Sequence, residues 1–178
     1  MPEGKTSPLR RMVYAAMFGA LTAIGAFIVI PMQPVPITLQ TMFTGLAGVL
    51  LGGYTAALSQ IVYVLLGIIG LPVFAGGKAG LGTLLGPTGG YLIGFIVGAL
   101  VIGKLVEMKR DAGLPWIVMA LLIGNVVIYA VGILQLSLVA HLSFVKALTV
   151  GAVPFLLGDA LKIAAASWLG LKLRDYLK

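Results

Sequence analysis

Residues 37–70 read ITLQTMFTGLAGVLLGGYTAALSQIVYVLLGIIG, a run of 34 residues without a charged side chain. As a single α-helix this run would be about 51 Å long, at about 1.5 Å per residue. The hydrocarbon core of a bilayer is about 30 Å thick, so such a helix is too long for one crossing. The Gly52-Gly53 pair near the middle offers a turn. The run therefore predicts two short membrane-spanning helices, over residues 37–52 and 54–70.

Four more apolar runs lie on either side of this stretch. A spanning helix needs about 20 mostly apolar residues, and each run approaches or exceeds that length. The six predicted spans are residues 12–30, 37–52, 54–70, 91–107, 116–140 and 154–172. We therefore expect residues 1–178 to form a single transmembrane domain, an all-α bundle of six helices.

The composition also indicates a membrane protein. Apolar residues make up 60% of the 178 residues and charged residues 10%, with a mean hydropathy of +1.12. Soluble domains average about 45–50% and about 25%, so a water-soluble globule is excluded. The chain has no Cys and one His, His141, which excludes disulfides and sites with several Cys or His ligands. The net charge of +7 does not indicate nucleic-acid binding, because the charges flank the apolar runs.

The basic residues predict the orientation in the membrane. In a six-helix chain, nine of them fall on one side and only Lys78 and Lys146 on the other. Cytoplasmic loops carry the excess of Lys and Arg, so both termini should be cytoplasmic. The protein is then a multi-pass protein of the cell membrane, with the lipid bilayer around it. The nine residues are Lys5, Arg10, Arg11, Lys104, Lys109, Arg110, Lys172, Arg174 and Lys178.

The expected external connections are residues 31–39, 71–90 and 141–153, and two of them are unusual. Residues 31–36 read PMQPVP, a stiff segment with three prolines. Residues 70–90 contain eight glycines but only one charge, which is atypical of a solvated loop. Glycine lets main-chain N–H groups approach a ligand closely. The apolar loop is either a re-entrant plug or a lid over a cavity that opens to the outside.

Two charged residues lie inside the last predicted span. Asp159 and Lys162 are three residues apart, so they share a helix face. Charged groups within a membrane are costly and usually functional. The pair is either a buried structural ion pair or a ligand site that combines an acceptor with a cationic donor. The single amides of Gln60, Asn125 and Gln135 are expected to form hydrogen bonds between helices.

Small residues recur four apart in two other spans. Gly90, Gly94 and Gly98 are expected to let their helix pack closely within the chain. Ala16 and Ala20 form a similar strip in the first span. This strip either packs inside the protein or receives the helix of a partner, and the spacing alone does not decide.

Four motifs in order resemble the biotin transporter family BioY. They are PVPITLQ at 34–40, GLPVF at 70–74, GPTGGYLIGF at 86–95 and GDALK at 158–162. Members of this family are the biotin-specific S-components, or substrate-binding subunits, of energy-coupling factor (ECF) transporters in prokaryotes. The resemblance implies a six-helix S-component fold that binds biotin near the outer surface. It also implies a transmembrane coupling protein and two cytoplasmic ATPases as partners, with Ala16 and Ala20 docking on the coupling protein.

The chemistry of biotin agrees with the polar residues. Asp159 can accept the ureido N–H groups and Lys162 can donate to the ureido oxygen. Lys78, Tyr91 and main-chain N–H groups of the glycine-rich loop are candidate partners for the carboxylate tail. Gln40, the last residue of the first motif, is a further candidate contact. Family members often carry a cation shortly after GPTGGY, where this chain has Leu92.

Other functions fit fewer residues. An S-component for another vitamin, such as thiamine or riboflavin, would need aromatic residues concentrated in the external loops. A solitary proton-coupled carrier would use Asp159 as a proton relay. An enzyme is not expected, because no nucleophile, metal site or paired carboxylates are apparent in the sequence, and we expect no cofactor.

Overall fold

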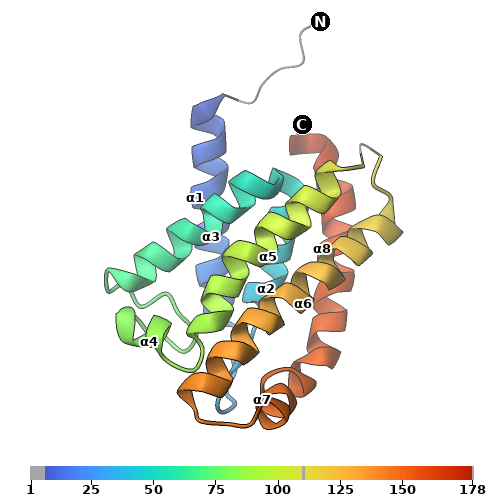
Figure 1. Cartoon of the computed structure of the whole chain (residues 1–178). Helices are drawn as coiled ribbons and strands as arrows, with labels where there is room; N and C mark the ends of the chain where they lie inside the picture. Colours follow the sequence, from blue (N-terminus) through green and yellow to red (C-terminus); the bar gives the residue numbers. More distant parts are fainter. Residues whose placement is uncertain (1–6, 110, 178) are drawn as a thin grey trace, which may run out of the picture.

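The computed structural model describes residues 7–109 and 111–177 and is mostly helical, which confirms the predicted fold class at that level (Figure 1). Helix α1 begins and helix α8 ends at the same end of the molecule, which we call the terminal end. The opposite end, which carries α4, α7 and a small hairpin, is the loop end. The elements are α1 (Pro8–Phe27), β1 (Val29–Ile30), β2 (Ile37–Thr38), α2 (Gln40–Leu51), α3 (Gly53–Ile68), α4 (Leu81–Leu85), α5 (Gly89–Glu107), α6 (Leu114–Val139), α7 (Phe144–Gly151), the 3₁₀-helix η1 (Val153–Phe155) and α8 (Leu156–Leu177).

The proline-rich segment forms the turn of a β-hairpin. Strands β1 and β2 pair antiparallel, with Val29 opposite Thr38, and the Gln33–Pro34 peptide bond between them is cis. The N–H of Leu39 donates to the carbonyl of Gly25 at 3.1 Å, which ties the end of α1 to the start of α2. Helix α1 therefore ends at Phe27 and α2 begins only at Gln40, inside the bounds expected at 12–30 and 37–52, because residues between them pair as strands.

The polar residues of α1, α2 and α3 bind one another across the helices. Gln60 is fully buried, and its amide nitrogen donates to the Thr22 hydroxyl at 3.2 Å. Its amide oxygen accepts a hydrogen bond from Thr44 at 3.1 Å. At the loop end, the amide nitrogen of Gln135 donates at 2.8 Å to the carbonyls of Leu84 and Gly86. Gln60 and Gln135 thus make the bonds between segments that were expected of single amides in apolar helices.

Helices α5 and α6 pack backbone against backbone along a line of glycines. A Cβ atom added to Gly94 would lie 2.9 Å from the carbonyl oxygen of Ile128. One added to Gly98 would lie 3.1 Å from the carbonyl oxygen of Gly124. We call Gly90, Gly94, Gly98, Gly124 and Gly132 the glycine seam. It is the close packing within the chain that the four-residue spacing predicted.

The connections at the loop end contain helices of their own. The segment expected to connect residues 71–90 includes α4, and that expected at 141–153 includes α7. Helix α7 begins where the Ser143 hydroxyl accepts the N–H of Lys146 at 3.4 Å.

Three stretches of the described residues are long and apolar enough to cross a bilayer. They are α5, α6 and the stretch Phe144–Arg174, which contains α7, η1 and most of α8. Helices α2 and α3 are also apolar but shorter. The chain is therefore built as a membrane protein.

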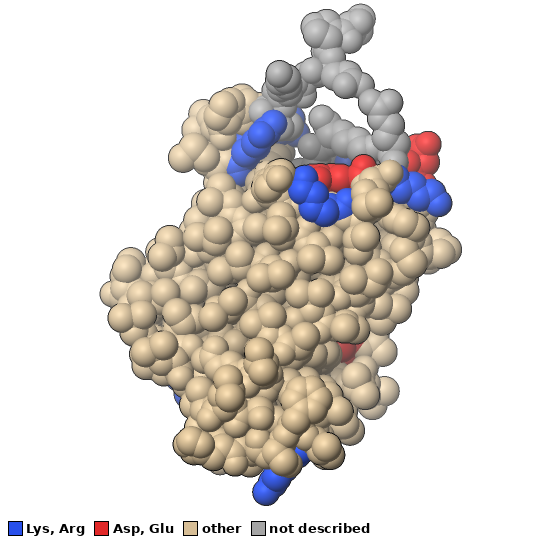
Figure 2. All heavy atoms as spheres, in the orientation of Figure 1, with Lys and Arg blue, Asp and Glu red and all other residues tan. Residues whose placement is uncertain are grey.

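The charged residues gather at the terminal end. Figure 2 shows Lys and Arg side chains concentrated there, over the ends of the helices, and few charges elsewhere on the visible face. The described cations that begin or end helices at this end are Arg10, Arg11, Lys104, Lys109, Lys172 and Arg174. Lys5, Arg110 and Lys178, which were also counted in predicting the orientation, lie outside the described residues.

Candidate ligand-binding cavity

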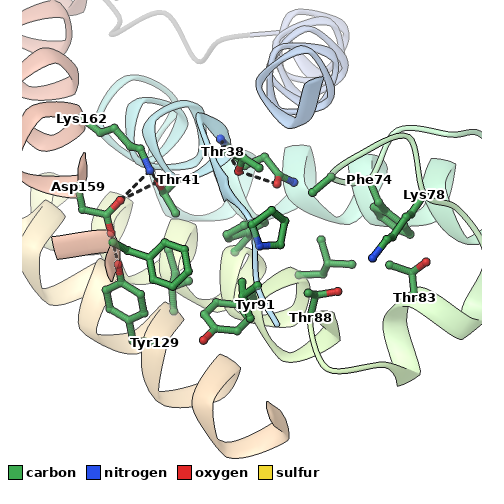
Figure 3. A pocket seen from close by; sticks show the side chains of 18 residues that line it. Thr38, Thr41, Phe74, Lys78, Thr83, Thr88, Tyr91, Tyr129, Asp159 and Lys162 are labelled. Carbon is green, nitrogen blue, oxygen red and sulfur yellow. Dashed lines mark hydrogen bonds and ion pairs between the residues drawn. The ribbon is translucent and has the colours of Figure 1, made fainter. Parts of the chain in front are cut away.

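A cavity lies at the loop end, between the hairpin, the glycine-rich loop and the helices α2, α5, α6 and α8 (Figure 3). Its empty volume is about 670 Å³, including the space at its opening. All five residues predicted to contact a ligand line it, although they come from four separate parts of the sequence. These residues are Gln40, Lys78, Tyr91, Asp159 and Lys162. Their roles in binding remain predictions.

Four polar side chains meet at the inner end of the cavity. The Lys162 ammonium lies 2.8 Å from Asp159 Oδ1 and donates to the Thr41 hydroxyl at 3.2 Å. The Thr41 hydroxyl in turn lies 3.4 Å from Asp159 Oδ1. The Tyr129 hydroxyl donates to the other carboxylate oxygen, Oδ2. We call Thr41, Tyr129, Asp159 and Lys162 the Asp159 cluster; it joins α2, α6 and α8 and has no net charge.

The Asp159 cluster leaves one donor and some acceptor capacity unused. A carboxylate offers about four lone-pair positions, and Asp159 accepts three hydrogen bonds from described residues. Lys162 has three N–H donors and uses two of them. Asp159 and Lys162 are 4% and 8% exposed, and both line the cavity. The cluster therefore matches a ligand group that carries an N–H donor beside a carbonyl acceptor.

The charged pair fits both interpretations that the sequence left open, a buried structural ion pair and a ligand site. Asp159 and Lys162 do form a buried ion pair, and the same pair also lines the cavity. Buried charges need both a partner and further hydrogen bonds, and the hydroxyls of Thr41 and Tyr129 supply these bonds.

Gln40 is held in the cavity wall by its own hydrogen bonds. Its amide oxygen accepts from the Thr38 hydroxyl at 2.8 Å, and its amide nitrogen donates to the Tyr63 hydroxyl. The Tyr63 hydroxyl donates to the carbonyl of Val73 at 3.1 Å. Gln40 thus connects β2, α3 and the glycine-rich loop, and its remaining amide N–H and lone pair are what it can offer a ligand.

Tyr91 presents its ring to the cavity rather than its hydroxyl. The hydroxyl donates to the carbonyl of Gly151 at 2.8 Å. The ring packs edge-on against Tyr129, with centroids 6.5 Å apart and an angle of 87° between the planes. Because its single O–H is already donated, Tyr91 is not free to donate to a carboxylate in this structure.

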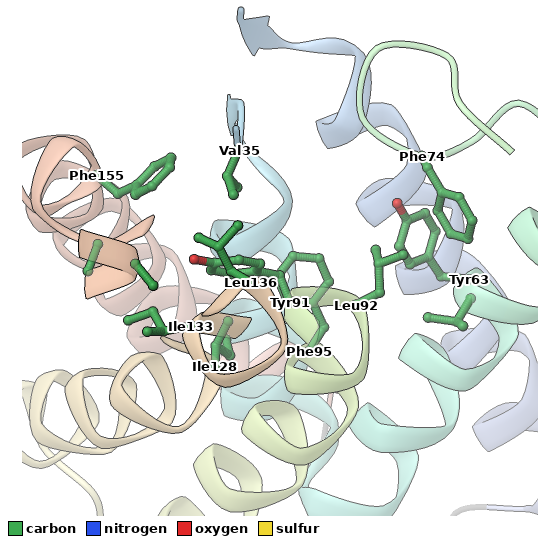
Figure 4. Packing of buried hydrophobic residues seen from close by; sticks show 13 residues of the cluster. Val35, Tyr63, Phe74, Tyr91, Leu92, Phe95, Ile128, Ile133, Leu136 and Phe155 are labelled. Atoms are coloured by element: carbon green, nitrogen blue, oxygen red, sulfur yellow. The ribbon is translucent and has the colours of Figure 1, made fainter. Parts of the chain in front are cut away.

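The middle of the cavity is apolar. Val35, Leu92, Phe95, Ile128 and Phe155 line it and belong to one buried hydrophobic cluster that also includes the ring of Tyr91 (Figure 4). Leu92 is 5% exposed, so the residue after the GPTGGY motif adds to the apolar wall. An apolar ring system fits between the polar inner end and the opening.

Lys78 lies across the cavity from the Asp159 cluster (Figure 3). It is exposed, and its ammonium makes no hydrogen bond or ion pair with the described residues. The hydroxyl-bearing residues Thr83 and Thr88 line the same part of the cavity. We call Lys78, Thr83 and Thr88 the mouth of the cavity.

The sequence reasoning did not identify Thr41, Tyr129 or Thr38. Tyr129 carries the one phenolic hydroxyl of α6, a mostly apolar helix of 26 residues, and a buried hydroxyl needs a partner. Thr38 and Thr41 lie within two residues of Gln40, and the sequence carried no other signal for them. Asn125, which the sequence singled out, lines a smaller cavity together with Thr41 and Lys162.

The two alanines of the first predicted span lie on the outside of the bundle. Ala16 and Ala20 are exposed, whereas Ala15 and Gly19 are buried. A Cβ on Gly19 would lie 3.0 Å from the carbonyl oxygen of Ser59, so this is the face of α1 that packs on α3. The strip of Ala16 and Ala20 is therefore not used for packing within the described chain.

Comparison with known proteins identifies the family. The model of the BioY family matches residues 2–178. The biotin transporter BioY of Thermotoga maritima is 44% identical over 166 residues, which cover 93% of this chain and 96% of the relative. The chain belongs to the BioY family.

Other BioY proteins and a solved structure agree with this. The biotin transporter BioY of Rhizobium etli is 40% identical over 171 residues, covering 90% of this chain and 91% of the relative. The fold matches the 2.1 Å crystal structure of the S-component for biotin from an ECF-type ABC transporter. That match has a TM-score of 0.87 at 29% identity and covers 97% of this chain and 95% of the other. The predicted family is thus confirmed.

Proposed function

We propose that this BioY protein is the biotin-binding S-component of an ECF transporter and mediates the uptake of biotin. The observation that carries the proposal is the Asp159 cluster, which has an unused donor and acceptor and lines the cavity next to its apolar middle. The ureido ring of biotin carries N–H groups beside a carbonyl oxygen, which complements this end. The thiophane ring then lies against Phe95, Ile128 and Phe155, and the tail extends toward the mouth.

The test is to purify the chain in detergent and identify any co-purified small molecule by mass spectrometry. We expect biotin, and we expect calorimetric titration of the emptied protein to give tight binding. The matched ligand is 2-iminobiotin, in which a guanidinium group replaces the ureido group at neutral pH. It should bind more weakly, because a guanidinium accepts no hydrogen bond and Lys162 loses its acceptor. Recovery of thiamine or riboflavin, or equal affinity for biotin and 2-iminobiotin, would overturn this assignment.

The proposal includes six membrane crossings, by α1, α2, α3, α5, α6 and α8, with both termini in the cytoplasm. The cations at the terminal end support it, since positive residues favour the cytoplasmic side. Helix α2 has 12 residues and is about 18 Å long, less than the bilayer core of about 30 Å. The hairpin completes this crossing at the loop end, and its backbone is acceptable there because it lines the cavity.

Single cysteines can test this topology cleanly, because the chain has none of its own. A membrane-impermeant maleimide added to intact cells should label Ser143→Cys at the start of α7. It should label Ser7→Cys at the start of α1 only after the cells are opened. The reverse pattern would show that the orientation is wrong.

The exposed strip of Ala16 and Ala20 supports docking on a transmembrane coupling protein that works with two cytoplasmic ATPases. Small side chains allow close approach of a partner helix, so Ala16→Trp should abolish ATP-driven uptake while the isolated subunit still binds biotin. Leu138→Trp, on an exposed face of α6, is the matched control and should leave uptake intact. Uptake that needs no ATPase and collapses with an uncoupler would instead favour a proton-coupled carrier. In either case the chain is a transport component rather than an enzyme, and we expect it to need no cofactor.

A further inference from the structure

Asn125 is the one side chain of α6 with N–H or O–H groups that makes no hydrogen bond with the described residues. Helix α6 has five such side chains, and the other four donate to groups outside the helix. Asn125 is half-buried in a helix that is otherwise mostly apolar, where an amide without a partner is costly. The four bonded side chains are Trp116, Tyr129, Gln135 and Ser137.

Asn125 lines a second, smaller cavity that shares two residues with the ligand cavity. The shared residues are Thr41 and Lys162, and the rest of the lining, apart from Asn125, is apolar. Asn125 lies one helical turn from Tyr129 on α6, and Lys162 lies almost one turn from Asp159 on α8. Because α6 and α8 run in opposite directions (Figure 1), Asn125 and Lys162 both lie on the terminal side of the bond between Tyr129 and Asp159.

The ammonium of Lys162 therefore has acceptors in two directions for one remaining proton. Asp159 and Thr41 accept two of its three N–H donors. The third can donate to the ureido oxygen of a ligand in the ligand cavity, or toward the amide oxygen of Asn125 in the second cavity. A single N–H cannot serve both acceptors well, so the two directions compete.

A water molecule can join Lys162 to Asn125 across the second cavity. The two side chains make no direct hydrogen bond in this structure, so their contact needs a bridge. The empty volume of the second cavity is about 220 Å³, which leaves room for a water molecule. Lys162, Thr41 and Asn125 supply the two to four polar partners that a buried water needs.

We infer that Asn125 is a positioning residue that competes with biotin for Lys162. In the ligand-free protein, the third N–H of Lys162 donates to a water held by Asn125. When biotin binds, its ureido oxygen takes this donor instead. The inference rests on the proposed function and adds to it a residue that lowers the affinity and favours release, because Asn125 satisfies Lys162 when the ligand leaves.

The test is Asn125→Leu, which removes the amide at similar size. The third N–H of Lys162 then loses its partner in the empty protein but keeps the ureido oxygen in the complex. The ligand-free melting temperature should fall, and the biotin affinity measured by calorimetry should rise by about threefold to tenfold, the range of one hydrogen bond. Slower release should account for most of this gain. A purely structural role for Asn125 would weaken binding instead.

A matched ligand and a matched variant separate competition from a general effect. The guanidinium of 2-iminobiotin accepts no hydrogen bond and leaves the link between Lys162 and Asn125 intact, so its affinity should be the same in wild type and Asn125→Leu. Ser137→Ala removes a different polar group of α6, one that lines neither cavity. This variant should keep the wild-type affinity for biotin, whatever its melting temperature.

Crystal structures of the wild type give a direct check that does not depend on a variant that folds. Without biotin, a water should bond to both Lys162 and Asn125; with biotin, Lys162 should donate to the ureido oxygen. Equal or weaker biotin binding by Asn125→Leu, an equal gain for 2-iminobiotin, or no bridging water would overturn the inference while the proposed function stands. A wild-type protein that binds no biotin would overturn both.

Discussion

At the inner end of the cavity, four side chains from three helices bind one another, and the two charges among them are at most 8% exposed. At the mouth, Lys78 stands exposed on a glycine turn without a partner among the described residues. The inner end is thus preorganised, and a change there leaves a buried group unpaired. The mouth acts mainly through charge in contact with water, where interactions are weaker and screened. The effects of substitutions at the two ends should therefore differ both in the property that changes and in magnitude.

The largest effect is expected from Asp159→Asn. This variant removes the acceptor for the ureido N–H groups, so biotin affinity measured by calorimetry should fall by about tenfold to 150-fold. It also leaves the Lys162 ammonium buried without its counter-charge, and ligand-free stability should fall by about 3–5 kcal/mol. The double variant Asp159→Asn/Lys162→Met carries neither charge and should melt above the single variant. A double variant that melts lower still would show that the pair is not the source of the loss.

Lys162→Met should have the next largest effect and tests whether this residue is functional or only structural. Asp159 would keep the hydrogen bonds from Thr41 and Tyr129, so the ligand-free melting temperature should fall less than in Asp159→Asn. The extra stabilisation by biotin follows mass action, about 4 kcal/mol at a thousandfold excess over Kd, and most of it should be lost. The measurement is a melting curve with and without biotin for each protein. A large fall without ligand combined with the full biotin-induced shift would mean that Lys162 is structural.

Tyr129→Phe and Thr41→Val should have intermediate effects. Each removes one neutral hydroxyl from the Asp159 cluster at nearly constant volume, and we expect biotin affinity to fall by about threefold to tenfold. Tyr54→Phe is a matched control, because the Tyr54 ring packs under Lys104 at the terminal end, far from the cavity. Equal loss of affinity in the control would point to a general defect in folding instead.

The smallest effect is expected from salt, and it should involve the mouth alone. Raising sodium chloride from about 50 mM to about 500 mM should weaken biotin binding by about twofold to threefold, because exposed charges are screened over a few ångströms at high ionic strength. Lys78→Met should show almost none of this dependence. A salt dependence of equal size in that variant would place the relevant charge elsewhere.

The sequence identified the charged residues of the cavity but not the hydroxyls that support them. Asp159 and Lys162 are detectable because any charge in an apolar span is unusual and a spacing of three places both on one helix face. Tyr129 was missed because α6 is apolar all round, so its sequence does not show which face turns toward the cavity. That orientation depends on tertiary packing against α5.

The same limit applies to the fold. Glycines spaced by four along α5 have one physical use, close packing, and the structure contains it in the glycine seam. The strands β1 and β2 have only two residues each, and the expected helical spans extended into both of them. Their pairing depends on where α1 and α2 lie, which a local sequence pattern does not specify.

The glycine seam also determines the width of the cavity between α5 and α6. Helix α5 contributes Tyr91, Leu92 and Phe95 to one wall, and α6 contributes Ile128 and Tyr129 to the facing part of the lining. The distance between these walls is fixed where the two backbones touch. A Cβ on Gly132 would lie 2.5 Å from an atom of the Tyr91 ring. Glycines that line no part of the cavity therefore determine how thick a ring can enter it. A single methyl group added in the seam would push α5 and α6 apart and change the shape of ligand that fits.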